Sequence, residues 1–156
     1  MSDPAPGIAS DAGPDFGPIS RSPVRVRYAE TDQMGVVYYA NYFVWFEIGR
    51  TDLLRTLGGT YRQLEADGLT LPVIEASCRY TAPCLYDEEL VVVTQGRLLS
   101  PIRVAFSYAV ERADGTVAAR GRTEHAAIGP DGRPRRLPAF LRGALTVADR
   151  GAARST

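Results

Sequence analysis

The strongest constraint on the fold is one long stretch of helical periodicity followed by four strand-like segments with no helix between them. The helical stretch follows Asn41, an expected cap residue, and Gly58-Gly59 ends it. Its shared face consists of Tyr42, Trp45, Phe46, Gly49, Leu53 and Leu57. The four later segments, separated by turn residues, cover residues 73–80, 89–98, 102–112 and 116–128. This order predicts an α+β fold in which an antiparallel meander packs against one helix.

Weaker patterns extend this prediction at both ends of the chain. Residues 24–28 alternate as a half-buried strand should, with Val24, Val26 and Tyr28 on one face. A short helical or irregular stretch is expected over residues 61–66, and a short helix over residues 140–145 after Pro138. The prediction is therefore a sheet of about five strands against one long helix.

The last predicted strand has a face of small residues. Val117, Ala119, Gly121 and Thr123 share that face, and side chains of this size would let a helix lie close to the sheet.

One helix covers only one side of such a sheet, so an edge strand and the outer face need a partner. We therefore expect a homodimer or a homotetramer.

The sequence predicts one domain with a tail at each end. Residues 1–21 contain several Pro, Gly and Asp residues without apolar periodicity, which predicts a disordered tail. The folded domain is expected over residues 22–148, and a flexible tail over residues 149–156. The sequence shows neither a secretory signal pattern nor the run of roughly 18 apolar residues that a spanning helix needs. We expect a cytoplasmic protein that does not bind membranes.

Composition excludes several kinds of chemistry. The formal net charge is zero, so the overall field gives no reason to expect nucleic acid as a partner. All 18 basic residues are arginine, which excludes Schiff-base chemistry on lysine. His125 is the only histidine, no nucleophile-elbow or phosphate-loop motif is present, and Cys78 and Cys84 cannot complete a zinc site with it. We expect no metal and no cofactor, and carboxylate chemistry remains.

One segment between the first predicted strand and the long helix carries the candidate chemistry. It reads Tyr28-Ala29-Glu30-Thr31-Asp32-Gln33-Met34-Gly35-Val36-Val37-Tyr38-Tyr39-Ala40-Asn41-Tyr42. It closely resembles the signature of the 4-hydroxybenzoyl-CoA thioesterase family of hotdog proteins. That signature is a Thr-Asp or Cys-Asp pair, a glycine, two apolar residues, then aromatic residues and Asn-Tyr leading into a helix. The resemblance extends from about residue 22 to residue 137 and includes Tyr80-Thr81-Ala82-Pro83 and Arg133-Pro134-Arg135-Arg136-Leu137-Pro138.

The resemblance implies a fold and an activity. The fold would be a hotdog fold, with a long central helix wrapped by a curved antiparallel sheet. The activity would be hydrolysis of an acyl-CoA thioester. Asp32 matches the family's catalytic carboxylate, which either attacks the thioester carbonyl or activates water. Tyr39 matches the residue whose backbone N–H is thought to polarise the thioester oxygen. Many relatives have histidine at this position, so Tyr39 favours the 4-hydroxybenzoyl branch without settling the substrate.

Other residues are candidates for substrate binding. Gly35, Val36, Tyr38 and Asn41 lie in the matched segment around the catalytic pair. Arg97, Ser100 and Arg103 flank a predicted turn between two strands, and arginine suits the phosphates of coenzyme A because it can bind them bidentately.

Alternative readings stay open for several of these residues. Asp32 could be a turn residue whose side chain caps the backbone, and the tyrosines could be core aromatics. Glu47 could be an acid or base, but its spacing to Arg50 favours an ion pair.

Two other functions fit the same fold. A non-catalytic acyl-CoA-binding module is one, because a fold alone does not confer activity. A hotdog dehydratase or hydratase is the other, but it needs a histidine near the helix start, and the only histidine is His125.

Overall fold

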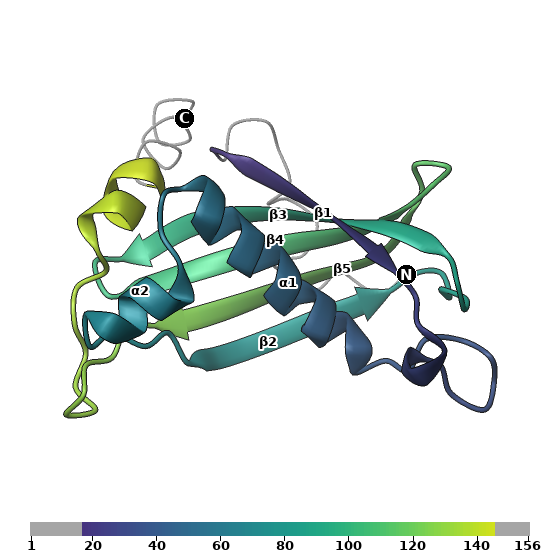
Figure 1. Ribbon diagram of the computed structural model, residues 1–156, viewed down its shortest axis with the longest axis horizontal. Helices are drawn as coiled ribbons and strands as arrows, with labels where there is room; N and C mark the ends of the chain where they lie inside the picture. The colour runs from purple at the N-terminus through teal and green to yellow at the C-terminus, as the bar shows by residue number, and fades with distance from the viewer. Residues whose placement is uncertain (1–16, 146–156) are drawn as a thin grey trace, which may run out of the picture.

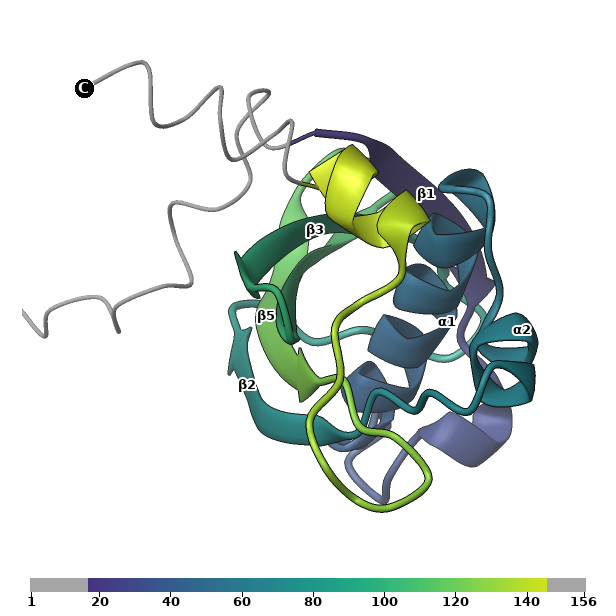
Figure 2. The ribbon, with the colours of Figure 1, turned by 90° about the vertical axis from the view of Figure 1, so that its left-hand side faces the viewer.

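A five-stranded antiparallel sheet curves around one long helix (Figures 1 and 2). The computed structural model describes residues 17–145. Its elements in chain order are β1 (Ile19–Arg25), the 3-10 turn η1 (Tyr28–Glu30), α1 (Asn41–Thr56), α2 (Tyr61–Ala66), β2 (Val73–Tyr80), β3 (Glu89–Ser100), β4 (Arg103–Arg112) and β5 (Val117–Ala126). Residues 139–145 are also helical. The predicted α+β fold, its long helix and the short helix after Pro138 are confirmed, and the stretch over residues 61–66 is helical.

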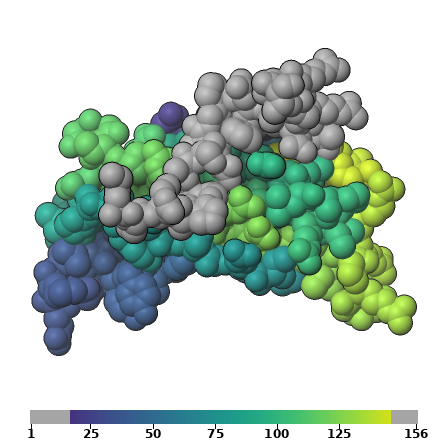
Figure 3. Space-filling model, turned by 180° about the vertical axis from the view of Figure 1, so that it is seen from behind, coloured from purple at the N-terminus to yellow at the C-terminus, as the bar shows by residue number. Residues whose placement is uncertain are grey.

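The sheet has the strand order β1-β3-β4-β5-β2, so β1 and β2 form its edges. Trp45, Phe46 and Leu53 of α1 are fully buried, as are Val104 and Phe106 of β4. The core therefore lies between α1 and the inner face of the sheet. Figure 3 shows the molecule from behind, where the teal and green atoms of the sheet strands are visible. No described helix is long and apolar enough to cross a membrane.

The first strand lies earlier in the chain than predicted. Residues 24–28 were expected to form it, but β1 covers Ile19–Arg25, and Tyr28 lies in η1 with 78% of its surface exposed. The core-facing positions of β1 include the buried Ser20 and Ser22. Because serine is polar, these positions do not show the apolar alternation by which a strand is predicted. The Ser22 hydroxyl donates a hydrogen bond of 2.6 Å to Asp52 of α1, which satisfies a polar group that would otherwise be costly to bury.

The predicted domain boundary is wrong at its start for the same reason. Residues 19–21 were assigned to a disordered tail but belong to β1. The rest of that predicted tail up to residue 16, the end of the predicted domain from residue 146 and the tail over residues 149–156 lie outside the described residues.

The small residue Gly121 on β5 leaves room for a side chain of α1, whereas the α1 backbone itself lies closest to β1 and β3. A Cβ atom built there would lie 2.2 Å from the ring of Phe46 and 3.0 Å from the carbonyl oxygen of Ser77. The Phe46 ring cannot retreat easily, because it is fully buried and stacks on Tyr108 with ring centroids 4.3 Å apart. The absence of a side chain at Gly121 is what lets the Phe46 ring of α1 pack directly on β5.

This contact gives a stability prediction. Gly121→Ala should lower the free energy of unfolding by about 1–3 kcal/mol, the usual cost of overpacking a core. Gly143→Ala is a matched control, because a Cβ atom there would meet nothing within 4 Å. Denaturant unfolding of both variants checks the prediction. Equal stability of the Gly121→Ala variant and the wild type would show that the helix can move away from the sheet without cost.

Candidate active site

Asp32 lies in a tight turn at the tip of the loop between β1 and α1. Its backbone N–H donates to the Val36 carbonyl at 2.8 Å, and its carbonyl accepts from the Gly35 N–H at 3.0 Å. Gly35 has a φ of +79°, a left-handed conformation that glycine adopts without strain. The Asp32 side chain closes the turn, since Oδ1 accepts a hydrogen bond of 2.8 Å from the Met34 N–H. Oδ2 has no hydrogen-bond partner among the described residues.

The capping role considered for Asp32 is therefore present, and it does not occupy the whole carboxylate. One oxygen fixes the orientation of the group while the other remains available to a substrate or a water molecule. A carboxylate held in one direction at a loop tip is suited to act as a nucleophile or as a general base.

Glu30 fastens this loop to α1, and the sequence interpretation gave it no role. The residue is 4% exposed, and its carboxylate accepts from the Trp45 indole N–H at 2.8 Å and from the Arg27 backbone N–H at 2.8 Å. Its carbonyl accepts from the Tyr38 N–H and from the Asn41 side chain, both at 2.8 Å. These bonds fix both arms of the loop against the start of the helix. The only signal in the sequence was its place directly before Thr31-Asp32.

Tyr39 lies on the returning arm of the loop, just before α1. Its side chain is 60% exposed, and its ring lies 4.7 Å from that of Tyr38. Its carbonyl accepts a hydrogen bond of 2.8 Å from the Tyr80 hydroxyl at the end of β2. Partial burial raises the pKa of Tyr80, so this hydroxyl keeps its proton at neutral pH and can donate. The Tyr39 N–H has no hydrogen-bond partner within residues 17–145.

The other predicted residues of this segment have mixed positions. Gly35 and Tyr38 are exposed beside the turn, and Val36 is half-buried and bridges to Leu85. Asn41 is not the cap residue that was predicted. Ala40 occupies the cap position without a side-chain hydrogen bond, and Asn41 is the first residue of α1. Its side-chain amide donates to the Glu30 carbonyl, so this side chain holds the loop and does not cap α1.

The three residues predicted to hold coenzyme A lie far from this loop in the same chain. Arg97 and Ser100 are in the last part of β3, and Arg103 begins β4. The turn between those strands is at one end of the sheet, whereas η1 and the start of α1 are at the other (Figure 1). A single chain therefore does not bring Arg97, Ser100 and Arg103 together with Asp32.

The remaining reactive side chains are structural in character. Burial raises the pKa of the Cys78 thiol to about 11 and also raises the pKa of Cys84, so neither is a ready nucleophile at neutral pH. His125 is fully buried in β5, and burial lowers its pKa, so it is neutral at pH 7. Within the described part of the chain, no cluster of three or more His, Cys, Asp or Glu side chains could hold a metal ion.

Comparison with known proteins agrees with this arrangement. Residues 26–145 match the model of the thioesterase-like superfamily. The acyl-CoA thioester hydrolase YbgC of Escherichia coli is 30% identical over 119 residues, which cover 76% of this chain and 89% of that protein. A 1,4-dihydroxy-2-naphthoyl-CoA hydrolase of Thermosynechococcus vestitus is 31% identical, covering 76% of this chain and 86% of that protein.

A solved structure gives the same answer for the fold. The DHNA-CoA thioesterase of Staphylococcus aureus superimposes with a TM-score of 0.73 at 31% identity, over 88% of this chain and 90% of that one. The predicted hotdog fold is confirmed, as is the resemblance to hotdog thioesterases. The match spans nearly all of the described residues and includes the Asp32 loop, α1 and every strand from β2 to β5. The chain belongs to the thioesterase-like superfamily.

Proposed function

We propose that this protein hydrolyses acyl-CoA thioesters at the loop that carries Asp32, with the start of α1 stabilising the developing oxyanion. One observation carries the proposal. The Asp32 turn uses one carboxylate oxygen to fix its own geometry and leaves the other without a partner, close in the chain to a Tyr39 N–H that is also without one. A carboxylate and an unpaired N–H before a helix are the two groups that acyl transfer requires.

Two routes use these groups. In the first, Oδ2 of Asp32 attacks the thioester carbon, the C–S bond breaks, and coenzyme A leaves as a thiolate; water then hydrolyses the resulting mixed anhydride. In the second, Oδ2 removes a proton from a water molecule whose oxygen attacks the same carbon. In both routes the carbonyl oxygen gains negative charge, which the Tyr39 N–H and the positive end of the helix dipole would stabilise.

The class of reaction also has support from relatives. Thioester hydrolysis is the activity named for the matched proteins of Escherichia coli, Thermosynechococcus and Staphylococcus. On that ground the chain is a thioester hydrolase, and an acyl-CoA is its substrate. We propose in addition the roles of Asp32 and Tyr39 in this reaction and a cytoplasmic location.

The competing candidate is a binding module on the same fold, in which Asp32 only closes its turn. Incubation of pure protein with a panel of acyl-CoAs and a thiol reagent separates the two. We expect thiol release well above the uncatalysed background for at least one acyl-CoA. Saturable binding of acyl-CoA without any release would support the module instead.

We also propose that the protein is a homodimer or a larger homo-oligomer. The edge strand β2 is exposed over most of its length, and its Val73, Ile74 and Tyr80 are each more than 40% exposed. Unpaired strand edges with apolar side chains favour association with another chain. A partner is also needed if Arg97, Ser100 or Arg103 is to reach a substrate held at Asp32.

Size measurement by light scattering after gel filtration tests this proposal. We expect at least twice the chain mass of 16.9 kDa in dilute buffer. A stable monomer with full activity would contradict both the oligomer and the contribution of a partner to the site.

A further inference from the structure

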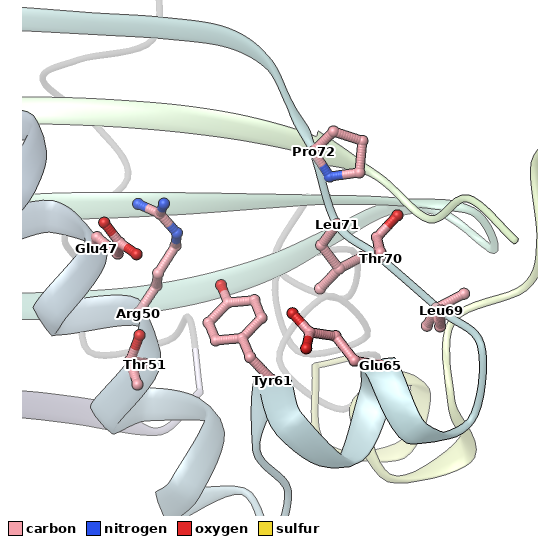
Figure 4. A pocket seen from close by; sticks show the side chains of 9 residues that line it. All are labelled: Glu47, Arg50, Thr51, Tyr61, Glu65, Leu69, Thr70, Leu71 and Pro72. Atoms are coloured by element: carbon pink, nitrogen blue, oxygen red, sulfur yellow. The ribbon is translucent and has the colours of Figure 1, made fainter. Parts of the chain in front are cut away.

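A pocket of about 490 Å³ opens between α1, α2 and the segment that leads into β2. Figure 4 shows Glu47 and Arg50 projecting toward this space from α1, and Tyr61 and Glu65 from α2. Leu71 lines it from the segment before β2. None of these residues belongs to the Asp32 loop, so the pocket has no role in the chemistry described so far.

Arg50 is the charged group inside this pocket. Its side chain is half-buried, whereas Glu47 and Glu65 are exposed at the rim. The predicted ion pair between Glu47 and Arg50 is not found. The ion pair on this part of α1 joins Arg55 to Asp52 at 3.4 Å, and Arg50 forms none within the described residues. A half-buried guanidinium without a carboxylate is costly unless other groups accept its hydrogen bonds.

A chain of buried polar groups lies behind Arg50, and the direction of each hydrogen bond can be assigned. The Leu71 carbonyl can only accept, so Nδ1–H of His125 donates to it at 2.9 Å. Nε2 of the neutral ring therefore accepts from the Thr123 hydroxyl at 2.9 Å. The Thr123 oxygen in turn accepts from the Tyr108 hydroxyl at 2.6 Å. The Tyr108 oxygen can still accept a hydrogen bond on the side of Arg50. Burial raises the pKa of Tyr108, and the charge of Arg50 lowers it in part.

The Tyr61 hydroxyl, next to Arg50, is a buried group that remains unsatisfied. It is buried and has no hydrogen-bond partner within residues 17–145. Burial raises the pKa of Tyr61, and the nearby charge of Arg50 lowers it in part, but the contact between them lacks hydrogen-bond geometry. Buried polar groups are almost always hydrogen-bonded, so an unpaired hydroxyl beside a guanidinium that has no carboxylate partner indicates a missing acceptor. An oxygen atom of a ligand would satisfy both.

The pocket and the Asp32 loop lie toward opposite ends of β2, and α1 runs from one to the other. The Tyr80 hydroxyl at the end of β2 donates to the Tyr39 carbonyl, and Leu71 and Pro72, just before the start of β2, line the pocket. Tyr80 faces α1, since its ring lies 4.9 Å from that of Tyr42, and Cys78 shares that face. Along α1, Arg50 is nine residues after Asn41, or about 13 Å of helix, and helical side chains lean back toward the N-terminus.

We propose that Arg50 and Tyr61 select acyl groups that carry a neutral oxygen, a hydroxyl or a keto group, remote from the thioester. The inference rests on the proposed thioester hydrolysis, because the acyl group must extend from the Asp32 loop between α1 and β2. Arg50 and Tyr61 then donate hydrogen bonds to the remote oxygen. A remote carboxylate is disfavoured, because Glu47 and Glu65 at the rim repel it.

The test compares acyl-CoAs that differ only in the remote substituent. The wild type is assayed with octanoyl-CoA, ω-hydroxyoctanoyl-CoA and suberoyl-CoA, and with a naphthoyl-CoA and its ring-hydroxylated counterpart. We expect kcat/KM to be at least tenfold higher for the hydroxylated member of at least one pair, as for sites built to bind a substrate hydroxyl. Arg50→Met and Tyr61→Phe should each lower this ratio severalfold. Arg55→Met, which removes an exposed guanidinium from the same helix, should leave it unchanged.

Each outcome has a distinct meaning. No thiol release from any acyl-CoA would contradict the proposed function itself. Hydrolysis without preference in either pair, or with suberoyl-CoA preferred to ω-hydroxyoctanoyl-CoA, would overturn the inference and leave the function standing. If Tyr61→Phe lowered kcat/KM equally for both members of a pair, the Tyr61 hydroxyl would contribute to folding and not to selectivity. Tyr61→Phe keeps the ring, so the test holds even if Arg50→Met does not fold.

Discussion

Asp32→Asn is expected to lower turnover by roughly two or more orders of magnitude, the scale of a general base, while acyl-CoA binding persists. The substitution isolates the chemistry from the fold. The amide oxygen of asparagine can accept the Met34 N–H just as Oδ1 of Asp32 does, so the turn is kept. What is lost is the negative charge, and with it both nucleophilicity and basicity. Steady-state thiol release and binding titration measure the two effects separately.

A second turn in the chain supplies the control. Oδ1 of Asp131 accepts from the Arg133 N–H at 3.1 Å, the same two-residue pattern as at Asp32. Asp131→Asn should leave turnover unchanged, because that turn has no chemical role here. Near wild-type turnover in Asp32→Asn would show that Asp32 is only a turn residue, and the proposed mechanism would fail.

A single-turnover reaction in oxygen-18 water then separates the two routes. If Asp32 attacks the thioester, water adds to the mixed anhydride, and label can enter the Asp32 carboxylate. If Asp32 activates water, all of the label enters the acid product. Mass spectrometry of the peptide that contains residues 28–42 distinguishes these results.

The fold could be predicted where side-chain alternation and burial agree. β2 covers the predicted residues 73–80, and Val104, Phe106, Tyr108 and Val110 of β4 are buried on one face as expected. β1 could not be placed, because two of its core-facing residues are serines and one of them is satisfied by Asp52, 30 residues away. A local sequence pattern does not show a hydrogen-bond partner that only folding brings close.

The candidate site divides in the same way. Asp32, Gly35 and Tyr39 were found through their order in one contiguous segment, and the structure places all three on one loop. The role of Glu30 depends on Trp45, and that of Tyr80 depends on the Tyr39 carbonyl, 41 residues away. The predicted coenzyme A contacts were chosen because arginine suits phosphate, and they were Arg97, Ser100 and Arg103. Side-chain chemistry does not say which end of the sheet a residue occupies. Arg50 was paired with Glu47 from spacing alone, although the buried groups behind it offer other contacts.

Tyr39→Phe should retain activity within about tenfold, equivalent to about 1.4 kcal/mol of barrier, whereas Tyr39→Pro should lose roughly two to three orders of magnitude. The proposed work of Tyr39 is done by its backbone N–H, which has no hydrogen-bond partner among the described residues and lies just before α1. Phenylalanine keeps that N–H and removes only an exposed hydroxyl. Proline removes the donor itself.

Because proline can also disturb the start of α1, the comparison needs a control with the same backbone change one residue later. Ala40 has a φ of −71°, which proline adopts, so Ala40→Pro removes a neighbouring N–H but keeps that of Tyr39. We expect Ala40→Pro to retain far more activity than Tyr39→Pro, with circular dichroism and melting showing similar folding of both. If Tyr39→Phe abolished turnover in a folded protein that still bound acyl-CoA, the hydroxyl would be the acid or donor. The oxyanion would then have to be stabilised by a group other than the Tyr39 N–H.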